Sequence, residues 1–305
     1  MDPITIDCHY TRPLMACAYL LVEGNEATFI ENNTTHALPH LLTALQSTGL
    51  TPEQVRYLMV THVHLDHAGG TSALLRLCPN ATVLAHPRAS QHLIDPTKLI
   101  ASAEAVYGTK QFKDLYGEIT AIPENRVRSL NDNESVGWGN RELVALYTKG
   151  HANHHLCVWD SKTHSLFTGD AFGLAYPELQ THGLFLFPST SPTQFLPQEA
   201  IASVNRLVAL NPKKLFLTHF GMVDDIPKAQ SQMLNELNFS EQLALEAKAS
   251  GGGFDNIQTF CYPKIENHLK KRALDLGLGP WESLRPLLEL DMKLNAAGLA
   301  HWASL

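Results

Sequence analysis

Four side chains that can bind a metal ion fall within six residues of one another: His62, His64, Asp66 and His67. They directly follow an apolar segment that reads as a buried strand. Side chains two residues apart in an extended segment point to the same face, so we expect His62 and His64 to emerge side by side. Imidazole and carboxylate groups together suit zinc, iron or manganese. The cluster therefore predicts a metal site at the end of this strand.

Three further candidate ligands follow later predicted strands. His151 comes just after a strand that ends at residue 148, Asp170 after one that ends at residue 168, and His219 after one over residues 214–218. A single histidine at a strand end is more often structural than functional. Four strand ends that each deliver His or Asp, however, predict ligands that converge on one edge of a sheet and form a rigid site.

Alternating strand-like and helix-like segments must position these ligands. Apolar periodicity predicts strands over residues 18–22, 27–31, 55–60, 81–85, 142–148, 156–159, 165–168 and 214–218. It predicts helices over residues 36–47, 71–77 and 198–210, a helical stretch from 87 to 123, and an all-helical chain after residue 221. Residues 171–197 lack a clear pattern, and a loop of this length inside a compact domain is often functional.

Composition excludes several classes of protein. With 305 residues, 44% of them hydrophobic and 17% charged, the chain can bury a core and is not disordered. A net charge of −7 argues against a nucleic-acid binder. Five cysteines without a CxxC pair argue against a disulfide framework. The N-terminal region shows neither a secretory signal nor a membrane span, so we expect a cytoplasmic protein that does not bind a membrane.

The ligand motifs resemble those of the metallo-β-lactamase superfamily. Its hallmark His-x-His-x-Asp-His stands at residues 62–67, and the later motifs match at Gly150-His151, Thr168-Gly169-Asp170 and His219. The resemblance covers roughly residues 15–222 and implies an α/β fold, the αββα sandwich, with metals at one edge between two sheets. We therefore expect a catalytic domain over residues 1–225 and a C-terminal helical extension over residues 226–305 packed on it.

The resemblance also implies a role for each ligand. The first metal would be held by His62, His64 and His151, and the second by Asp66, His67 and His219. Asp170 would bridge the two metals, and His155 would support the site from behind the ligands. The complete set looks like that of the glyoxalase II and lactonase branches. It implies two divalent metal ions, with zinc as the first choice and iron or manganese as alternatives.

The activity implied is that of a metal-dependent hydrolase. A hydroxide bridging the metals would attack an ester, thioester or lactone bond, with Asp170 holding the metals and Asp66 orienting the hydroxide. Ligand pockets tend to have apolar walls, so the aromatic residues Phe172, Tyr176 and Phe185 are candidates for the substrate pocket. They favour a small, partly apolar substrate.

Two other interpretations remain open from the sequence. One is a phosphodiesterase of the same superfamily. The other is a metal-binding regulatory protein whose hydrolysis is incidental. For the hydrolase and for the phosphodiesterase alike, we expect a small-molecule substrate as the partner. We expect no nucleic-acid partner and no membrane partner. A homodimer is a further expectation.

Overall fold

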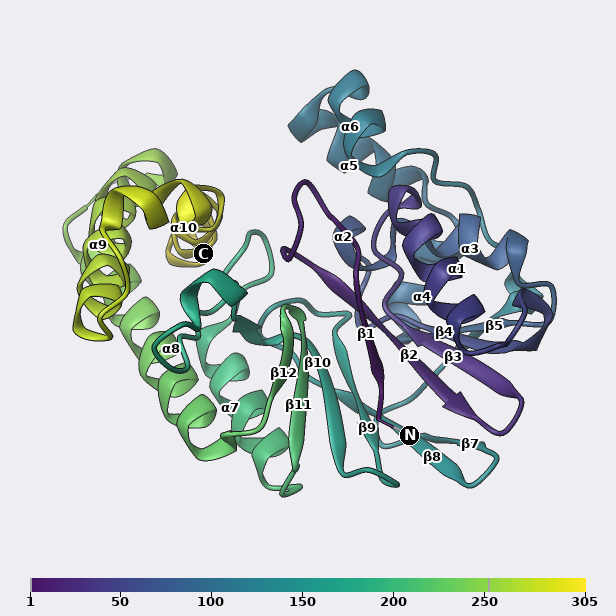
Figure 1. Ribbon diagram of the computed structural model, residues 1–305. Coiled ribbons are helices and arrows are strands. Elements are labelled where there is room, and N and C mark those ends of the chain that lie inside the picture. The colour runs from purple at the N-terminus through teal and green to yellow at the C-terminus, as the bar shows by residue number, and fades with distance from the viewer. Residues whose placement is uncertain (1, 252) are drawn as a thin grey trace. The chain divides into compact units, whose positions relative to one another are not determined.

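Two six-stranded β-sheets form the framework of the protein (Figure 1). The computed structural model describes residues 2–251 and 253–305. The first sheet runs in the order β1 (Ile4–Asp7), β2 (Cys17–Glu23), β3 (Glu26–Ile30), β4 (Val55–Met59), β5 (Thr82–Ala85) and β6 (Val127–Ser129). The second runs in the order β12 (Gly221–Val223), β11 (Lys214–His219), β10 (Ser165–Leu174), β9 (Leu156–Asp160), β8 (Arg141–Tyr147) and β7 (Ser135–Trp138).

Helices connect the strands and end the chain. The α-helices are α1 (Leu38–Ser47), α2 (Leu65–Ala68), α3 (Thr71–Leu77), α4 (Pro87–Ile94), α5 (Thr97–Tyr107), α6 (Thr109–Tyr116), α7 (Pro197–Val208), α8 (Ile226–Ala249), α9 (Phe254–Asp275) and α10 (Trp281–Ser304). Short 3₁₀ turns cover Thr35–Ala37, Pro52–Gln54, Glu124–Arg126 and Pro177–Leu179.

The chain divides into two compact units, each made of three segments. The first unit comprises the chain up to Tyr147, then His154–Gly169 and Lys213–Met222. The second comprises Thr148–Asn153, Asp170–Pro212 and Val223–Leu305. The predicted division into domains at residue 225 stays a prediction.

Strand pairing in the first sheet explains where its helices lie. β2 pairs antiparallel with β1 on one side and with β3 on the other. From β3 onward, each strand pairs parallel with the next, through β4 and β5 to β6. Parallel neighbours need a crossover connection, and α1, α3 and α4 lie in these crossovers and pack against the sheet (Figure 1). The parallel strands therefore all end at the same edge, where the predicted ligands follow β4.

Side chains on the two faces of the first sheet enter different cores. On β2, Ala18 and Leu20 pack into the core beneath the helices, whereas Tyr19 and Leu21 pack into a core shared with the second sheet. That shared core includes Phe167 of β10. Burial on both faces is why β2 reads as a continuous apolar run. Two sheets that share a core, with helices beside them, form the layered sandwich that the motifs led us to expect.

The C-terminal part of the second unit is all helical, as predicted. Helix α10 packs along α9 and α8, and α8 packs along α7 (Figure 1). Asp225 caps α8 by accepting a hydrogen bond from the backbone N–H of Lys228, which satisfies a donor that has no partner within the helix. Buried side chains of α8 include Met233 and Leu237. Among the described residues, no helix is both long enough and apolar enough to cross a membrane.

Two local features differ from the predicted elements. The strand expected over residues 165–168 continues as β10 to Leu174, so part of the expected irregular stretch is regular. A short helix, α2, begins at Leu65, so Asp66 and His67 lie within a helical turn.

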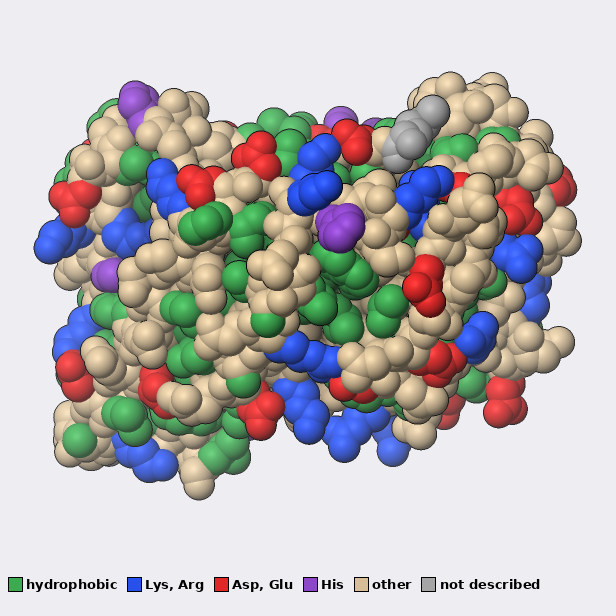
Figure 2. Space-filling view, turned by 90° about the horizontal axis from the view of Figure 1, so that it is seen from below, with side chains coloured by type: hydrophobic (Ala, Val, Ile, Leu, Met, Phe, Trp, Pro, Cys, Tyr) green, Lys and Arg blue, Asp and Glu red, His purple; other side chains and the backbone are tan. Residues whose placement is uncertain are grey.

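On the face shown in Figure 2, basic and acidic side chains are mixed, with a short run of basic ones at its lower edge. The expectation that the protein does not bind nucleic acid stays a prediction.

Candidate metal centre

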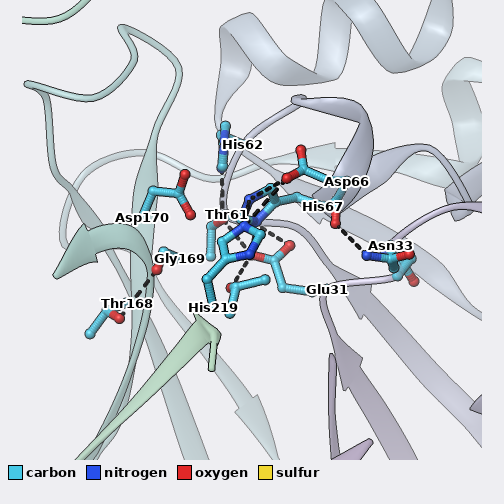
Figure 3. Close-up of polar contacts among 12 residues, drawn as sticks. Glu31, Asn33, Thr61, His62, Asp66, His67, Thr168, Gly169, Asp170 and His219 are labelled. Atoms are coloured by element: carbon cyan, nitrogen blue, oxygen red, sulfur yellow. Dashed lines mark hydrogen bonds and ion pairs between the residues drawn. The ribbon is translucent and has the colours of Figure 1, made fainter. Parts of the chain in front are cut away.

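Three predicted ligands of the first unit converge in the structure. Asp66 and His67 come from α2, and His219 is the last residue of β11. One donor atom from each lies within 4.8 Å of the others. Figure 3 shows the three side chains pointing toward one another. Asp66 and His67 follow β4 of the first sheet and His219 ends β11 of the second, so ligands from both sheets converge within the first unit.

The closest atoms in this group are ring nitrogens and a carboxylate oxygen. Nε2 of His219 lies 3.4 Å from Nε2 of His67 and 3.3 Å from Oδ2 of Asp66. Nε2 of His67 lies 3.8 Å from the same carboxylate oxygen. Both histidines are buried, whereas the Asp66 side chain is 25% exposed. Asp66 is therefore the member of the group that solvent reaches most readily.

The opposite ring nitrogens show which tautomers the histidines adopt. Nδ1 of His219 lies 2.8 Å from the backbone oxygen of Met15, and a carbonyl oxygen only accepts hydrogen bonds. Nδ1 of His67 lies 3.1 Å from Oε1 of the buried Glu31. Both Nδ1 atoms therefore carry a proton, so Nε2 is the nitrogen of each ring that can bind a cation. Two such nitrogens and a carboxylate oxygen face one another, which is an arrangement that a cation stabilises.

Glu31 and Thr61 connect this group to His62. The Thr61 hydroxyl donates to Oε1 of Glu31, so its single proton is used there. Nδ1 of His62 lies 3.0 Å from the same hydroxyl oxygen and must therefore be the donor. Glu31 thus orients His67 directly and His62 through Thr61 (Figure 3). Carboxylates in this position fix ring orientation and raise the basicity of metal-binding imidazoles.

The rings of His62, His64 and His155 lie close together in the first unit. The ring centre of His62 is 4.4 Å from that of His64 and 4.9 Å from that of His155. Gly169 leaves room for this packing, because a Cβ atom there would lie 2.6 Å from Nε2 of His155 and 2.6 Å from Oγ1 of Thr61. His155 is buried beside a proposed ligand, where a supporting histidine would be expected.

The remaining two predicted ligands, His151 and Asp170, belong to the second unit. Nε2 of His151 lies 3.4 Å from Oδ2 of Asp170. Nδ1 of His151 lies 3.1 Å from the backbone oxygen of Ser189, to which it must donate a hydrogen bond. Here again the Nε2 atom of a ring faces a carboxylate oxygen. The assignment of all seven ligands to one dinuclear centre stays a prediction.

The three aromatic residues predicted for the substrate pocket are fully buried. Phe172, Tyr176 and Phe185 are each at most 1% exposed. The Tyr176 hydroxyl donates to Asp291 of α10, and the Arg272 guanidinium lies 4.4 Å above the Phe185 ring centre. Their predicted contact with a substrate stays a prediction.

Sequence reasoning missed Glu31, Thr61 and the two carbonyl groups that orient histidines. A signal for Glu31 existed, because it follows β3, which is the parallel neighbour of β4. Parallel neighbours end at the same edge, so an acidic residue there lies near ligands that follow β4. The carbonyl oxygens of Met15 and Ser189 left no such signal, since every residue has a backbone oxygen.

The fold agrees with the comparison to known proteins. Residues 22–219 match the metallo-beta-lactamase superfamily, and the chain belongs to this family. A metallo-beta-lactamase fold-containing protein of Sulfurisphaera tokodaii, ST1585, is 28% identical over 203 residues, which are 65% of this chain and 72% of that protein.

Two further relatives widen the comparison. The crystal structure of TTHA1429, a metallo-beta-lactamase family protein of Thermus thermophilus, has a TM-score of 0.66, with 17% identity over 99% of this chain and 92% of that chain. An atrochrysone carboxyl ACP thioesterase of Pseudocercospora fijiensis is 24% identical over 196 residues, which are 64% of this chain and 44% of that protein. The first shows the shared fold, and the second is a relative named for thioester cleavage.

Proposed function

We propose that the protein is a metal-dependent hydrolase that cleaves an ester, thioester or lactone bond of a small, partly apolar substrate. The observation that carries the proposal is the convergence of one possible ligand atom each from Asp66, His67 and His219. Nδ1 of His67 and of His219 each donates to an acceptor oxygen, so the Nε2 atom of each ring is directed toward a cation. Membership of a metallohydrolase superfamily supports the same conclusion.

The donor set suits two divalent ions, for which zinc is our first choice. His62, His64 and His151 would hold one ion, His67, His219 and Asp66 the other, and Asp170 both. Imidazole and carboxylate ligands also suit iron and manganese. Bound ions of this kind acidify water and polarise a carbonyl oxygen.

The protein's own groups would supply orientation and proton transfer. Glu31, Thr61 and the carbonyl oxygens of Met15 and Ser189 hold the imidazoles in the tautomer that binds a cation. Because the Asp66 carboxylate is the most exposed of its group, we propose that it accepts a proton from the attacking water. A cation bound beside its Oδ2 atom would favour the ionised carboxylate that such a step requires.

The bond class rests on the relatives and on the acidic surface. A relative named as a thioesterase supports carboxylic ester and thioester substrates. The net charge of −7 disfavours polyanionic substrates. Free, buried cysteines at Cys8, Cys17, Cys78, Cys157 and Cys261 support our proposal of a cytoplasmic protein. We further propose that it works as a homodimer, without nucleic acid or membrane partners.

The decisive experiment measures metal content and activity together. Protein produced with added zinc, iron and manganese should contain more than one metal per chain and hydrolyse p-nitrophenyl esters, thioesters or lactones. Asp170→Asn should lose most of this activity, whereas Asp224→Asn, outside the ligand set, should retain it. Fewer than one metal per chain would contradict the proposal. Activity on bis-p-nitrophenyl phosphate alone would identify a phosphodiesterase, and metal binding without hydrolysis would favour a regulatory protein.

A further inference from the structure

A buried polar loop lies beside α2 in the first unit. It consists of Asn32, Asn33 and Thr34, which we call the asparagine loop, and none of the three is more than 2% exposed. Asn33 has φ of +52°, a backbone conformation that side-chain-bearing residues adopt only where the surrounding structure holds them. Buried amide groups are also unfavourable unless they are hydrogen-bonded. The contacts of this loop therefore show what it does.

The asparagine loop binds the backbone of two proposed metal ligands. The backbone N–H groups of Asn32 and Asn33 both donate to the backbone oxygen of His67, at 2.9 Å and 3.0 Å. Nδ2 of Asn33 donates to the backbone oxygen of Asp66 at 2.8 Å (Figure 3). A helix as short as α2 is not stable by itself, and the last carbonyl groups of any helix have no partner within it. The loop supplies these partners.

Gly70, which follows α2, allows the loop to approach this closely. A Cβ atom at Gly70 would lie 2.7 Å from the backbone oxygen of Asn32 and 2.7 Å from that of Thr34. The backbone N–H of Gly70 donates to the backbone oxygen of Asn33 at 2.7 Å. Any other residue would force the loop and α2 apart, so the sequence keeps the two in contact.

The Asn33 side chain makes this contact at the expense of one of its own atoms. Its Oδ1 atom is buried and has no hydrogen-bond partner among the described residues. A buried acceptor without a partner lowers the stability of a protein. Stability alone therefore does not account for an amide here, whereas the hydrogen bond to Asp66 does.

We infer that Asn33 is a positioning residue for the ion that Asp66, His67 and His219 would hold. The inference rests on the proposed metal-dependent function. Asn33 touches no ligand atom, and its amide fixes the turn from which the Asp66 carboxylate and the His67 ring project. His62 and His64 precede this turn, and Thr61 orients His62. Loss of the amide should therefore weaken one of the two proposed ions and spare the other.

The variants separate the side chain from the backbone conformation. Asn33→Gly removes the amide, and glycine adopts positive φ without strain. Asn33→Asp keeps the size of the side chain and its tolerance of positive φ, but it replaces the donor by an acceptor. Asn211→Gly is the matched control, because Asn211 is exposed, has φ of +53°, and its Nδ2 donates at 3.5 Å to the backbone oxygen of Ala209.

The main measurement is cobalt(II) titration of chelator-treated protein, followed by visible absorption, in two backgrounds. In His64→Ala, which retains the ligands Asp66, His67 and His219, Asn33→Gly should weaken cobalt binding about 10–100-fold. In Asp66→Ala, which retains His62 and His64, it should have no effect. Asn33→Asp should follow Asn33→Gly, and Asn211→Gly should change neither background. Equal weakening in both backgrounds, or weakening in neither, would overturn the inference.

Two measurements on metal-free, full-length protein distinguish positioning from a general role in folding. Opening of α2 breaks the hydrogen bond from Asn33, so residues 64–70 should exchange backbone hydrogen about 2–10-fold faster in Asn33→Gly than in wild type. The free energy of unfolding in urea should stay close to that of Asn211→Gly, because the substitution removes an unsatisfied acceptor together with a donor. Lower stability without faster local exchange would overturn the positioning role.

A hydrolysis assay separates this inference from the proposed function. Wild type and Asn33→Gly are compared with p-nitrophenyl acetate at saturating zinc. The cobalt and exchange results expected above, in a protein that cleaves no ester, thioester or lactone, would overturn the proposed hydrolase and leave the role of Asn33 in place. Hydrolysis by wild type, together with cobalt binding that is insensitive to Asn33→Gly, would overturn the role of Asn33 and leave the hydrolase in place.

Discussion

Thr190 donates two hydrogen bonds to Asn295 of α10. Oδ1 of Asn295 accepts from the backbone N–H of Thr190 at 2.7 Å, and the Thr190 hydroxyl donates to the backbone oxygen of Asn295 at 3.1 Å. Nδ2 of Asn295 also donates to the backbone oxygen of Pro188 at 2.9 Å. The residue between these two contacts is Ser189, whose carbonyl group orients His151. The last helix thus holds the loop that positions a proposed metal ligand.

We predict that Asn295→Leu lowers both stability and metal affinity. It leaves a buried N–H and a buried carbonyl group without their partner, at a cost of about 1–3 kcal/mol for each group. Urea unfolding measures the first effect, and competition with a chromophoric chelator measures the second. Asn295→Asp, which retains the acceptor for Thr190, should lose less metal affinity, and Glu289→Gln on α10 should lose none. Equal metal affinity for Asn295→Leu and wild type would show that the helix does not position His151.

Removal of the charge at Glu31 should weaken metal binding about 10–100-fold, as expected for a group that orients a ligand. In Glu31→Gln, a neutral amide replaces the carboxylate that accepts from His67 and Thr61. Chelator competition measures the affinity, and circular dichroism checks the fold. Glu26→Gln is the matched control, because Glu26 lies on β3 but contacts Arg56 and Trp138 away from the ligands. Equal losses in both variants would contradict an orienting role.

Gly169→Ala should destabilise the protein by about 1–3 kcal/mol, because a close-packed site cannot accept the added methyl group without displacement. The residue has φ of +49°, and its new Cβ would press on His155 and Thr61. The measurement is the free energy of unfolding in urea. Gly137→Ala on β7 is the control, since a Cβ there meets nothing within 4 Å. If the two variants were equally stable, the packing described around His155 would be wrong.

Alkaline pH should reveal how much the buried, protonated Tyr116 side chain contributes to the free energy of unfolding. Burial, followed by the nearby Tyr10 and Asp66, raises the pKa of Tyr116 above its ordinary value. The unfolded chain therefore releases this proton at a lower pH than the folded protein does. The stabilisation is fully present below about pH 10 and is lost as the pH rises above it, at up to about 1.4 kcal/mol per pH unit.

The test is to compare urea unfolding at pH 8 and pH 10.5 for wild type and Tyr116→Phe. Wild type should lose about 1 kcal/mol more than the variant between the two pH values, because phenylalanine has no proton to release. The Tyr10 hydroxyl donates to the Tyr116 hydroxyl at 3.3 Å, and Tyr116→Phe also removes this bond, so the difference between pH values, rather than the absolute stability, is the informative quantity. Parallel losses in the two proteins would refute this contribution.

The resemblance of the ligand motifs to a known family implied the fold and the grouping of Asp66, His67 and His219, whereas the position of these ligands at strand ends followed from local patterns. Alternation of apolar residues marks strands, and ligands directly after a strand must lie at a sheet edge. The role of Glu31 depends on which strand pairs with β4, and such pairing is set by contacts distant in the chain. Aromatic residues such as Phe172 look alike in sequence whether they fill a core or line a pocket.

The division of each unit into three chain segments has a consequence for synthesis on the ribosome. The first unit lacks an interior strand of its second sheet, β11, until the chain has been made up to about residue 219. The second unit acquires His151 and Asp170 early, but the loop that orients His151 is held by Asn295, near the end of the chain. Nascent chains released before α10 is made would therefore contain every predicted ligand and still lack an ordered His151. Truncated products of this kind should bind metal poorly, although none of their ligands is missing.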